Sequence, residues 1–305
     1  MKKKSCVLVW LLMLTCLLTG CIQLPPEGEN PSDTAESNSQ MNHPFQHFYP
    51  DAVYVYQSDV DVDLLLTGFD PAYLLLANKT NVLGRDYVPS SLKTLTLPYT
   101  KKTGLQLESR TADALCAMME EMRADGVLVV DKDTGGPNVW VTSGYRDYSY
   151  QQSLYNTYYQ YELTHLSEDA IYYFGDAYIQ THYRDKGLTG LNPDDARKVV
   201  LSYSALPGTS EHQTGLCVDF ITDSMSGLTN SFANTAAFSW LSENAYKFGF
   251  ILRYPSDKVD VTGYSYESWH YRFVGREAAT DMYFAKLTLE EYLVALNEKN
   301  GITEE

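Results

Sequence analysis

Cysteine is scarce in this chain of 305 residues, which holds five, and three of them precede residue 22. The other two, Cys116 and Cys217, are too few to form the disulfide framework of a small extracellular protein. A single bridge between them is an open alternative. Cys116 lies among apolar residues at helical spacing, however, so we expect it to pack in a core.

Positive charge is also scarce, because 23 Lys and Arg face 39 Asp and Glu and the formal net charge is -16. An excess of acidic side chains of this size repels phosphate backbones and anionic surfaces. The composition therefore predicts no nucleic acid partner.

The sequence lacks an apolar run long enough to cross a bilayer. Its most apolar stretch, residues 7–18, is shorter than the ~20 residues that a spanning helix needs. It follows three lysines and precedes Leu18-Thr19-Gly20-Cys21, an order typical of a secretory signal with a lipobox. We expect residues 1–20 to be a signal peptide and Cys21 to carry the lipid that holds the protein at the extracellular face of the membrane; a permanent transmembrane anchor is the weaker alternative.

Residues 21–48 contain prolines, serines and acids without apolar periodicity, so they cannot repay the entropy of ordering. They predict a flexible tether that lets the following part sit away from the membrane. Residues 49–305 are long enough to bury one sizeable core and show no internal repeat. We expect them to form one domain, and the protein to be a monomer.

Two short segments carry the residues of a possible metal site. Ser210-Glu211-His212 is followed by Asp219 at the far end of an apolar stretch, and Glu267-Ser268-Trp269-His270 comes later. A catalytic zinc site uses three nitrogen or oxygen ligands and keeps a position for water. His212, Asp219 and His270 can be those ligands, which leaves Glu267 as a base for the water proton. The alternatives are ordinary histidines and an Asp219 that pairs with an arginine.

The pattern S-x-H-x-x-G-x-x-x-D, followed roughly fifty residues later by E-x-W-H, resembles the zinc D-alanyl-D-alanine carboxypeptidases of the VanY type. The resemblance implies an α+β, Hedgehog/DD-peptidase-like fold, in which helices cover an antiparallel sheet around one Zn²⁺ per chain. It also implies removal of the C-terminal D-alanine from a peptidoglycan stem peptide. An L,D-carboxypeptidase, an endopeptidase that cuts cross-links and a non-catalytic peptidoglycan-binding module remain as alternatives.

A second segment, Ser143-Gly144-Tyr145-Arg146 with Gln151 further on, follows a predicted strand. A guanidinium at a strand end can bind a carboxylate or a developing oxyanion, although Arg146 could instead pair with Asp147 at the surface. S-G-Y-R-x-x-x-x-Q resembles the substrate-binding segment of the same family. The resemblance implies that Arg146 contacts the oxyanion or carboxylate. It gives Ser143 and Gln151, together with Ser210 of the other motif, the role of polar substrate contacts.

Cys217 and Glu267 raise questions of geometry. On a strand, Cys217 shares a face with Asp219 and its thiolate could bind zinc, but a small apolar residue is usual there in the family, so we favour packing. Glu267 and His270 would face opposite sides of a regular strand, which predicts a bend at Ser268, where the family usually has proline.

Apolar periodicity predicts the remaining elements. Strands are expected at residues 127–130, 139–142, 216–221 and 250–255, and helices at 167–183, 192–203, 232–248, 276–285 and 288–297. Four further histidines, at positions 43, 47, 165 and 182, have no paired motif and are expected to be structural or surface residues.

Overall fold

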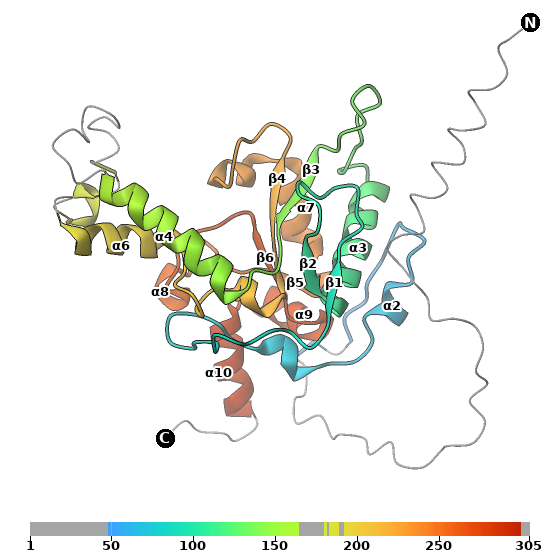
Figure 1. The fold of residues 1–305 in the computed structure, drawn as a ribbon. Coiled ribbons are helices and arrows are strands. Elements are labelled where there is room, and N and C mark those ends of the chain that lie inside the picture. The colour runs from blue at the N-terminus through green and yellow to red at the C-terminus, as the bar shows by residue number, and fades with distance from the viewer. Residues whose placement is uncertain (1–47, 50, 165–179, 182, 189–191, 300–305) are drawn as a thin grey trace, which may run out of the picture.

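The computed structural model describes residues 48–49, 51–164, 180–181, 183–188 and 192–299 (Figure 1). The predicted signal peptide, Cys21 and nearly all of the tether lie outside these residues. So do most of the aromatic helix expected at 167–183 and the four histidines without a paired motif.

An antiparallel sheet of four strands forms the centre of the fold, in the order β3 (Val139–Ser143), β4 (Cys217–Thr222), β6 (His270–Phe273) and β5 (Phe250–Leu252). A second sheet pairs β1 (Leu92–Thr94) with β2 (Gln106–Glu108), also antiparallel. Helices surround the central sheet in Figure 1. The predicted α+β architecture around an antiparallel sheet is confirmed.

The helices are α2 (Val62–Leu65), α3 (Ser109–Ala124), α4 (Tyr148–Thr164), α6 (Pro193–Tyr203), α7 (Ala236–Asn244), α8 (Val259–Thr262), α9 (Arg276–Ala285) and α10 (Leu289–Lys299). Short 3₁₀ turns occur at η1 (Pro71–Leu74), η2 (Arg184–Lys186), η3 (Glu211–Thr214), η4 (Asn230–Asn234) and η5 (Ala245–Phe248). The predicted helix at 192–203 and the two final helices are confirmed. Asn192 caps α6 by accepting a hydrogen bond from the backbone N–H of Asp195.

The alternation of side chains along β4 and β6 separates the core from the functional face. Val218 and Phe220 of β4, like Tyr271 and Phe273 of β6, are fully buried or nearly so in the main hydrophobic cluster with α3 and α7. Because neighbouring strand residues point to opposite sides, Asp219 and His270 project from the other face. Apolar packing on one side thus holds the polar side chains on the other.

The helix α3 contains Cys116, one of the two cysteines discussed above. The carboxylate of Glu108 caps its first turn by accepting from Thr111 N, and the apolar side of the helix, including Cys116, is buried. Neither Cys116 nor Cys217 forms a disulfide, so the alternative of a bridge between them is wrong. The packing role of Cys116 is confirmed.

Two elements differ from the predictions. The strand predicted at 127–130 is wrong, since Val130 makes one isolated bridge to Pro137 and the Asp131 carboxylate closes a turn by accepting from the backbone of Asp133 and Thr134. The helix predicted at 232–248 is broken into η4, α7 and η5, because Thr235 accepts from Phe238 N and starts a new helix.

The first described residues are bound to the helix α9. Phe48, assigned to the tether, already donates its backbone N–H to the Asp281 carboxylate at 2.9 Å, and Tyr49 does so at 3.0 Å. Among the described residues, no helix has the length and apolar character needed to cross a membrane.

Candidate metal centre

Strand register brings the predicted ligands together. Asp219 on β4 is paired with His270 on β6 and with Ser143 on β3, next to an irregularity in the β3–β4 ladder. His212 comes from η3, which ends at Gly215 with φ of 70°. A side chain at Gly215 would put its Cβ 2.9 Å from Glu108 N, so glycine is needed where this turn leads into β4.

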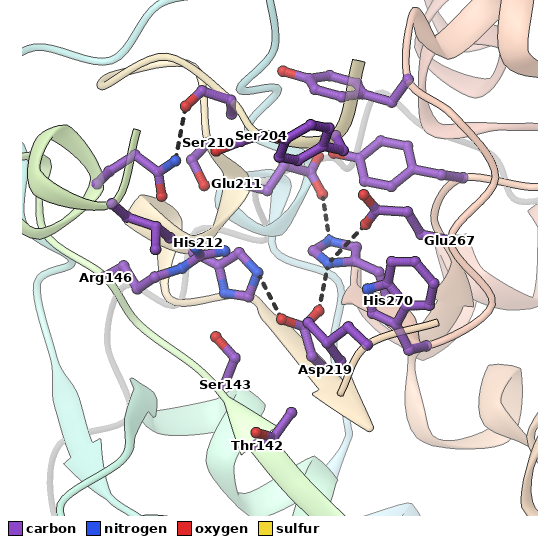
Figure 2. Close-up of a pocket in the computed structure, with 18 of the residues that line it drawn as sticks. Thr142, Ser143, Arg146, Ser204, Ser210, Glu211, His212, Asp219, Glu267 and His270 are labelled. Atoms are coloured by element: carbon purple, nitrogen blue, oxygen red, sulfur yellow. Dashed lines mark hydrogen bonds and ion pairs between the residues drawn. The ribbon is translucent and has the colours of Figure 1, made fainter. Parts of the chain in front are cut away.

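The three side chains face one another in a buried cluster (Figure 2). His212 Nε2 lies 3.3 Å from Asp219 Oδ2, and His270 Nδ1 lies 2.9 Å from Asp219 Oδ1. The two imidazole rings are 5.1 Å apart, and each of the three residues is 3% exposed. Asp219 therefore pairs with two histidines, and among the described residues no arginine pairs with it.

The two histidines present different nitrogens. His212 Nδ1 lies 2.7 Å from the carbonyl oxygen of Gly144, which can only accept, so Nδ1 carries a hydrogen and Nε2 faces Asp219. Arg146 N in turn donates to His212 O at 3.0 Å, which ties the two motif segments together. A side chain at Gly144 would put its Cβ 2.6 Å from Gln106 O, so no other residue fits there.

The electrostatics of the cluster suit a divalent cation. Burial works to raise the pKa of Asp219, but the two imidazoles hold it well below its ordinary value. Burial works to lower the pKa of His270, but Cys217 and Asp219 hold it well above its ordinary value. A cation could replace the protons held here, and two nitrogens with one carboxylate are a zinc ligand set. The donor atoms of His212, Asp219 and His270 thus fit zinc.

Cys217 offers a second possible ligand set. Its Sγ and one nitrogen of each histidine all lie within 4.8 Å of one another. However, Cys217 is fully buried and does not line the cavity that Asp219, His212 and His270 share. A substrate must approach from the cavity, so we keep Asp219 as the expected third ligand and Cys217 as a packed neighbour.

Glu267 lies beside His270 just before β6. Ser268 and Trp269 form a turn, closed by His270 N donating to Glu267 O at 3.3 Å, so the predicted bend at Ser268 is confirmed. Glu267 Oε2 is 3.9 Å from His270 Nδ1, and its side chain is 17% exposed. Burial outweighs the nearby histidines and raises the pKa of Glu267 to about 7, which suits a group that takes and returns a proton.

All the site residues predicted from the sequence, apart from the lipidation site Cys21, line one cavity of about 440 Å³. They are Ser143, Arg146, Gln151, Ser210, His212, Asp219, Glu267 and His270. Three of them come from the segment 143–151, and the other five come from the two metal segments. Tertiary structure therefore collects the three motifs at one place.

Arg146 and Gln151 keep polar atoms unpaired at this cavity. Arg146 Nε is buried without a hydrogen-bond partner, and among the described residues no carboxylate pairs with its side chain. Asp147 instead caps α4 by accepting from Tyr150 N at 2.7 Å, so the alternative of an Arg146–Asp147 pair is wrong. Gln151 Nε2 donates to Ala205 O at 2.8 Å, while its Oε1 is buried and unpartnered.

Sequence reasoning missed a buried charge cluster behind the histidines. Arg253 Nε and Arg272 Nη1 donate to Glu211 Oε1 at 2.8 and 2.9 Å, and none of the three side chains is exposed. The available signal was an arginine within each of two apolar strand segments and a glutamate adjacent to His212. The pairing itself could not be read from the sequence, because some forty to sixty residues separate the partners.

Comparison with known proteins gives a consistent result. A family model described as "VanY: D-alanyl-D-alanine carboxypeptidase" matches residues 104–276, more than half of the chain. A D-alanyl-D-alanine carboxypeptidase of Enterococcus faecalis is 35% identical over 72% of this chain and 65% of its own length, just under two thirds.

Solved structures show the same relationship. A variant of the D,D-pentapeptidase VanY from a VanB-type resistance cassette, in complex with Zn(II), is 34% identical with a TM-score of 0.52, over 73% of this chain and 99% of that one. VanYB in complex with D-alanine-D-alanine gives the same identity and TM-score, over 73% and 97%. The LdcB LD-carboxypeptidase is 30% identical with a TM-score of 0.54, over 78% and 92%.

Proposed function

Because the chain belongs to the VanY D-alanyl-D-alanine carboxypeptidase family, we propose that it is a zinc-dependent peptidase that removes the C-terminal D-alanine from peptidoglycan stem peptides. The observation that carries the proposal is the convergence of His212, Asp219 and His270 at one cavity with Glu267 3.9 Å from His270. The Zn(II) and D-alanine-D-alanine complexes of VanY proteins support the same cofactor and substrate class.

The residues divide the work of peptide hydrolysis. When bound to His212, Asp219 and His270, zinc supplies Lewis acidity and activates water. Glu267 accepts the proton of the attacking water and returns it to the leaving amine, as a carboxyl group with a pKa of about 7 can do near neutral pH.

Arg146 presents the other charge that the reaction needs. Its guanidinium reaches the cavity with an unpartnered Nε, so it can bind the oxyanion that develops on the scissile carbonyl or the terminal carboxylate of the peptide. Ser143, Ser210 and the free Oε1 of Gln151 line the same cavity and supply hydrogen-bonding groups for the peptide backbone.

The test is to incubate zinc-loaded protein with muramyl pentapeptide, tetrapeptide and cross-linked dimer, and to follow each product by mass. We expect loss of one alanine from the pentapeptide and none after zinc is removed with a chelator. Cleavage of the tetrapeptide alone would support an L,D-carboxypeptidase, which the similarity to LdcB favours as second candidate. Cleavage of the dimer alone would indicate an endopeptidase, and no product with zinc bound would indicate a binding module.

The proposed location is the outer face of the cell membrane, with Cys21 lipidated and the domain acting as a monomer on the wall. The lipobox, the Pro- and Ser-rich segment after it and the acidic composition support this location. Cys21→Ala should move the protein from the membrane fraction to the medium without loss of peptidase activity. A Cys21→Ala protein that stays in the membrane fraction after signal cleavage would contradict lipid anchoring.

A further inference from the structure

Two buried polar atoms behind the metal centre face each other without a hydrogen-bond partner. They are Glu211 Oε2 and His270 Nε2, 3.6 Å apart, just beyond normal hydrogen-bond length. A buried polar atom without a partner is unfavourable, because it has lost its hydrogen bonds to water and gained none in the protein. A small approach of the two atoms would satisfy both, and Figure 2 shows the contact opposite the side where His270 meets Asp219.

Glu211 is held in place by its other oxygen. Oε1 accepts from Arg253 Nε at 2.8 Å and from Arg272 Nη1 at 2.9 Å, and all three side chains are fully buried. Two guanidinium groups at hydrogen-bond distance hold this oxygen and leave Oε2 without a partner. Glu211 therefore has one oxygen fixed and the other available to accept from His270.

Glu290 on α10 completes the cluster. Arg253 Nη1 and Nη2 donate to its two carboxylate oxygens at 2.8 and 2.6 Å, a bidentate pair. The two arginines are then balanced by two carboxylates, which removes the penalty of an unpaired buried charge.

The cluster also reaches the N-terminal part of the domain. Arg272 Nη2 donates to Tyr73 O and Leu75 O at 2.9 and 2.7 Å. Residues 73, 75 and 290 all lie outside the segment 104–276 matched by the family model. Parts of this chain beyond the segment matched by the family model therefore support the metal centre.

Ring stacking alone does not fix the orientation of His270. Tyr254 stacks on His270 with ring centres 5.0 Å apart and planes 29° apart. Stacking restrains the plane of the ring, but a flip of the imidazole keeps that plane and exchanges nitrogen for carbon at both edges. Asp219 at Nδ1 favours one of the two orientations, and a hydrogen-bond acceptor at Nε2 favours the same one from the opposite edge of the ring.

We infer that Glu211 is a positioning residue that accepts the Nε2–H of His270 and so holds Nδ1 toward Asp219 and the cavity, with Arg253, Arg272 and Glu290 holding Glu211. The inference rests on the proposed function, in which His270 is a zinc ligand. The Glu211 side chain is fully buried and held by two arginines, so it acts on the reaction through His270.

The experiment measures zinc binding by the full-length protein after removal of metal, in competition with a chromophoric chelator. We expect Glu211→Gln to weaken zinc binding about 10–100-fold, as loss of a partner behind a ligand histidine typically does. Its amide cannot accept from both arginines and from His270 at once. Glu290→Gln should weaken zinc binding in the same direction but less, since Glu211 keeps its direct arginine contacts.

Glu291→Gln is the matched control. Glu291 is the next residue on α10, and it bonds Lys258 and Thr288 rather than the cluster. The Glu291→Gln substitution should reduce the melting temperature slightly and leave zinc affinity unchanged. The visible spectrum of the cobalt-substituted protein gives a second readout, which should change in Glu211→Gln and Glu290→Gln but not in Glu291→Gln.

The inference is wrong if folded Glu211→Gln and Glu290→Gln have the same zinc affinity and the same cobalt spectrum as the parent. If Glu211→Gln does not fold, the comparison of zinc affinity between Glu290→Gln and Glu291→Gln tests the inference by itself. A parent that binds zinc but cleaves none of the three peptides overturns the proposed function only, whereas a parent that binds no zinc overturns both.

Discussion

The cavity has two unlike walls. The sheet wall consists of η3, β4 and β6 and carries His212, Asp219 and His270, each 3% exposed and each in contact with at least one other member of the trio. The helical wall consists of α4 and α6, which lie together at one side of the molecule in Figure 1. Of the 17 residues of α4, just Gln151, Tyr155 and Glu162 are buried.

The polar groups of the helical wall are mostly tyrosines. Tyr203 OH donates to Glu162 Oε1 at 2.9 Å and Tyr183 OH to Glu162 Oε2 at 2.8 Å, while the ring of Tyr158 packs edge-on against Tyr203 at 5.5 Å. Tyr150 and Tyr203 are 51% and 39% exposed.

The difference between the two walls indicates that they have different roles. Buried, paired charges hold the sheet wall in one geometry, which catalysis requires to within a fraction of an ångström. Exposed tyrosines on the helical wall can change without disturbing the metal centre. We therefore expect the sheet wall to set the chemistry and the helical wall to set which peptide fits.

The largest effect is expected from the sheet wall ligands. His212→Ala or His270→Ala removes one of the three proposed ligands, so both zinc and peptidase activity should fall below detection. Metal analysis and the pentapeptide assay measure this. Lys198→Ala, at an exposed position on α6, is the control and should keep both. A His270→Ala protein with full zinc content would contradict the ligand assignment.

Loss of the base should separate chemistry from metal binding. Glu267→Gln keeps size but cannot accept the proton, so kcat should fall by about 10²–10⁴-fold while zinc content stays at the level of the parent. Steady-state kinetics with metal analysis on the same sample test this. If Glu267→Gln cleaves as fast as the parent, Glu267 is not the base.

Arg146 lies at the border between the two walls, at the start of the segment that leads into α4. Arg146→Ala should keep zinc and lower kcat by about 10²–10³-fold if the guanidinium binds the oxyanion. If it binds the terminal carboxylate instead, KM should rise for peptides with a free carboxylate and stay unchanged for their C-terminal amides. Equal kinetics of Arg146→Ala and parent on both substrates would remove Arg146 from the site.

A change on the helical wall should alter selectivity rather than chemistry. Tyr203→Phe removes the hydrogen bond to Glu162, and we expect the ratio of kcat/KM between pentapeptide and tetrapeptide to change by about tenfold or less. Zinc content should not change. An equal loss on both peptides would show that Tyr203 supports folding and not substrate choice.

The smallest effect is expected from Cys217→Ala. Removing one buried sulfur should lower the free energy of unfolding by about 1 kcal/mol, measured by denaturant unfolding, and leave zinc affinity unchanged. If Cys217→Ala loses zinc while the parent keeps it, Cys217 and not Asp219 is the third ligand.

The site was predictable where local pattern carries the information. The motif segments put His212, Asp219, Glu267 and His270 at short spacings, and the structure brings them together at one cavity. Strong apolar periodicity likewise predicted β4 and α9. The prediction of a strand at 127–130 was wrong because the Asp131 carboxylate accepts from the backbone of the next residues. The resulting Asx turn is more favourable here than continuing a short apolar run as a strand.

The sequence by itself determined which groups could do the chemistry, since residue type fixes what can bind zinc or take a proton. Tertiary structure alone decided which nitrogen each histidine presents, through Gly144 O for His212 and Glu211 for His270. It also decided that Glu211 has Arg253 and Glu290 behind it. Such contacts join residues far apart in the chain, and only burial in a folded interior makes a charged group so dependent on the partner it meets there.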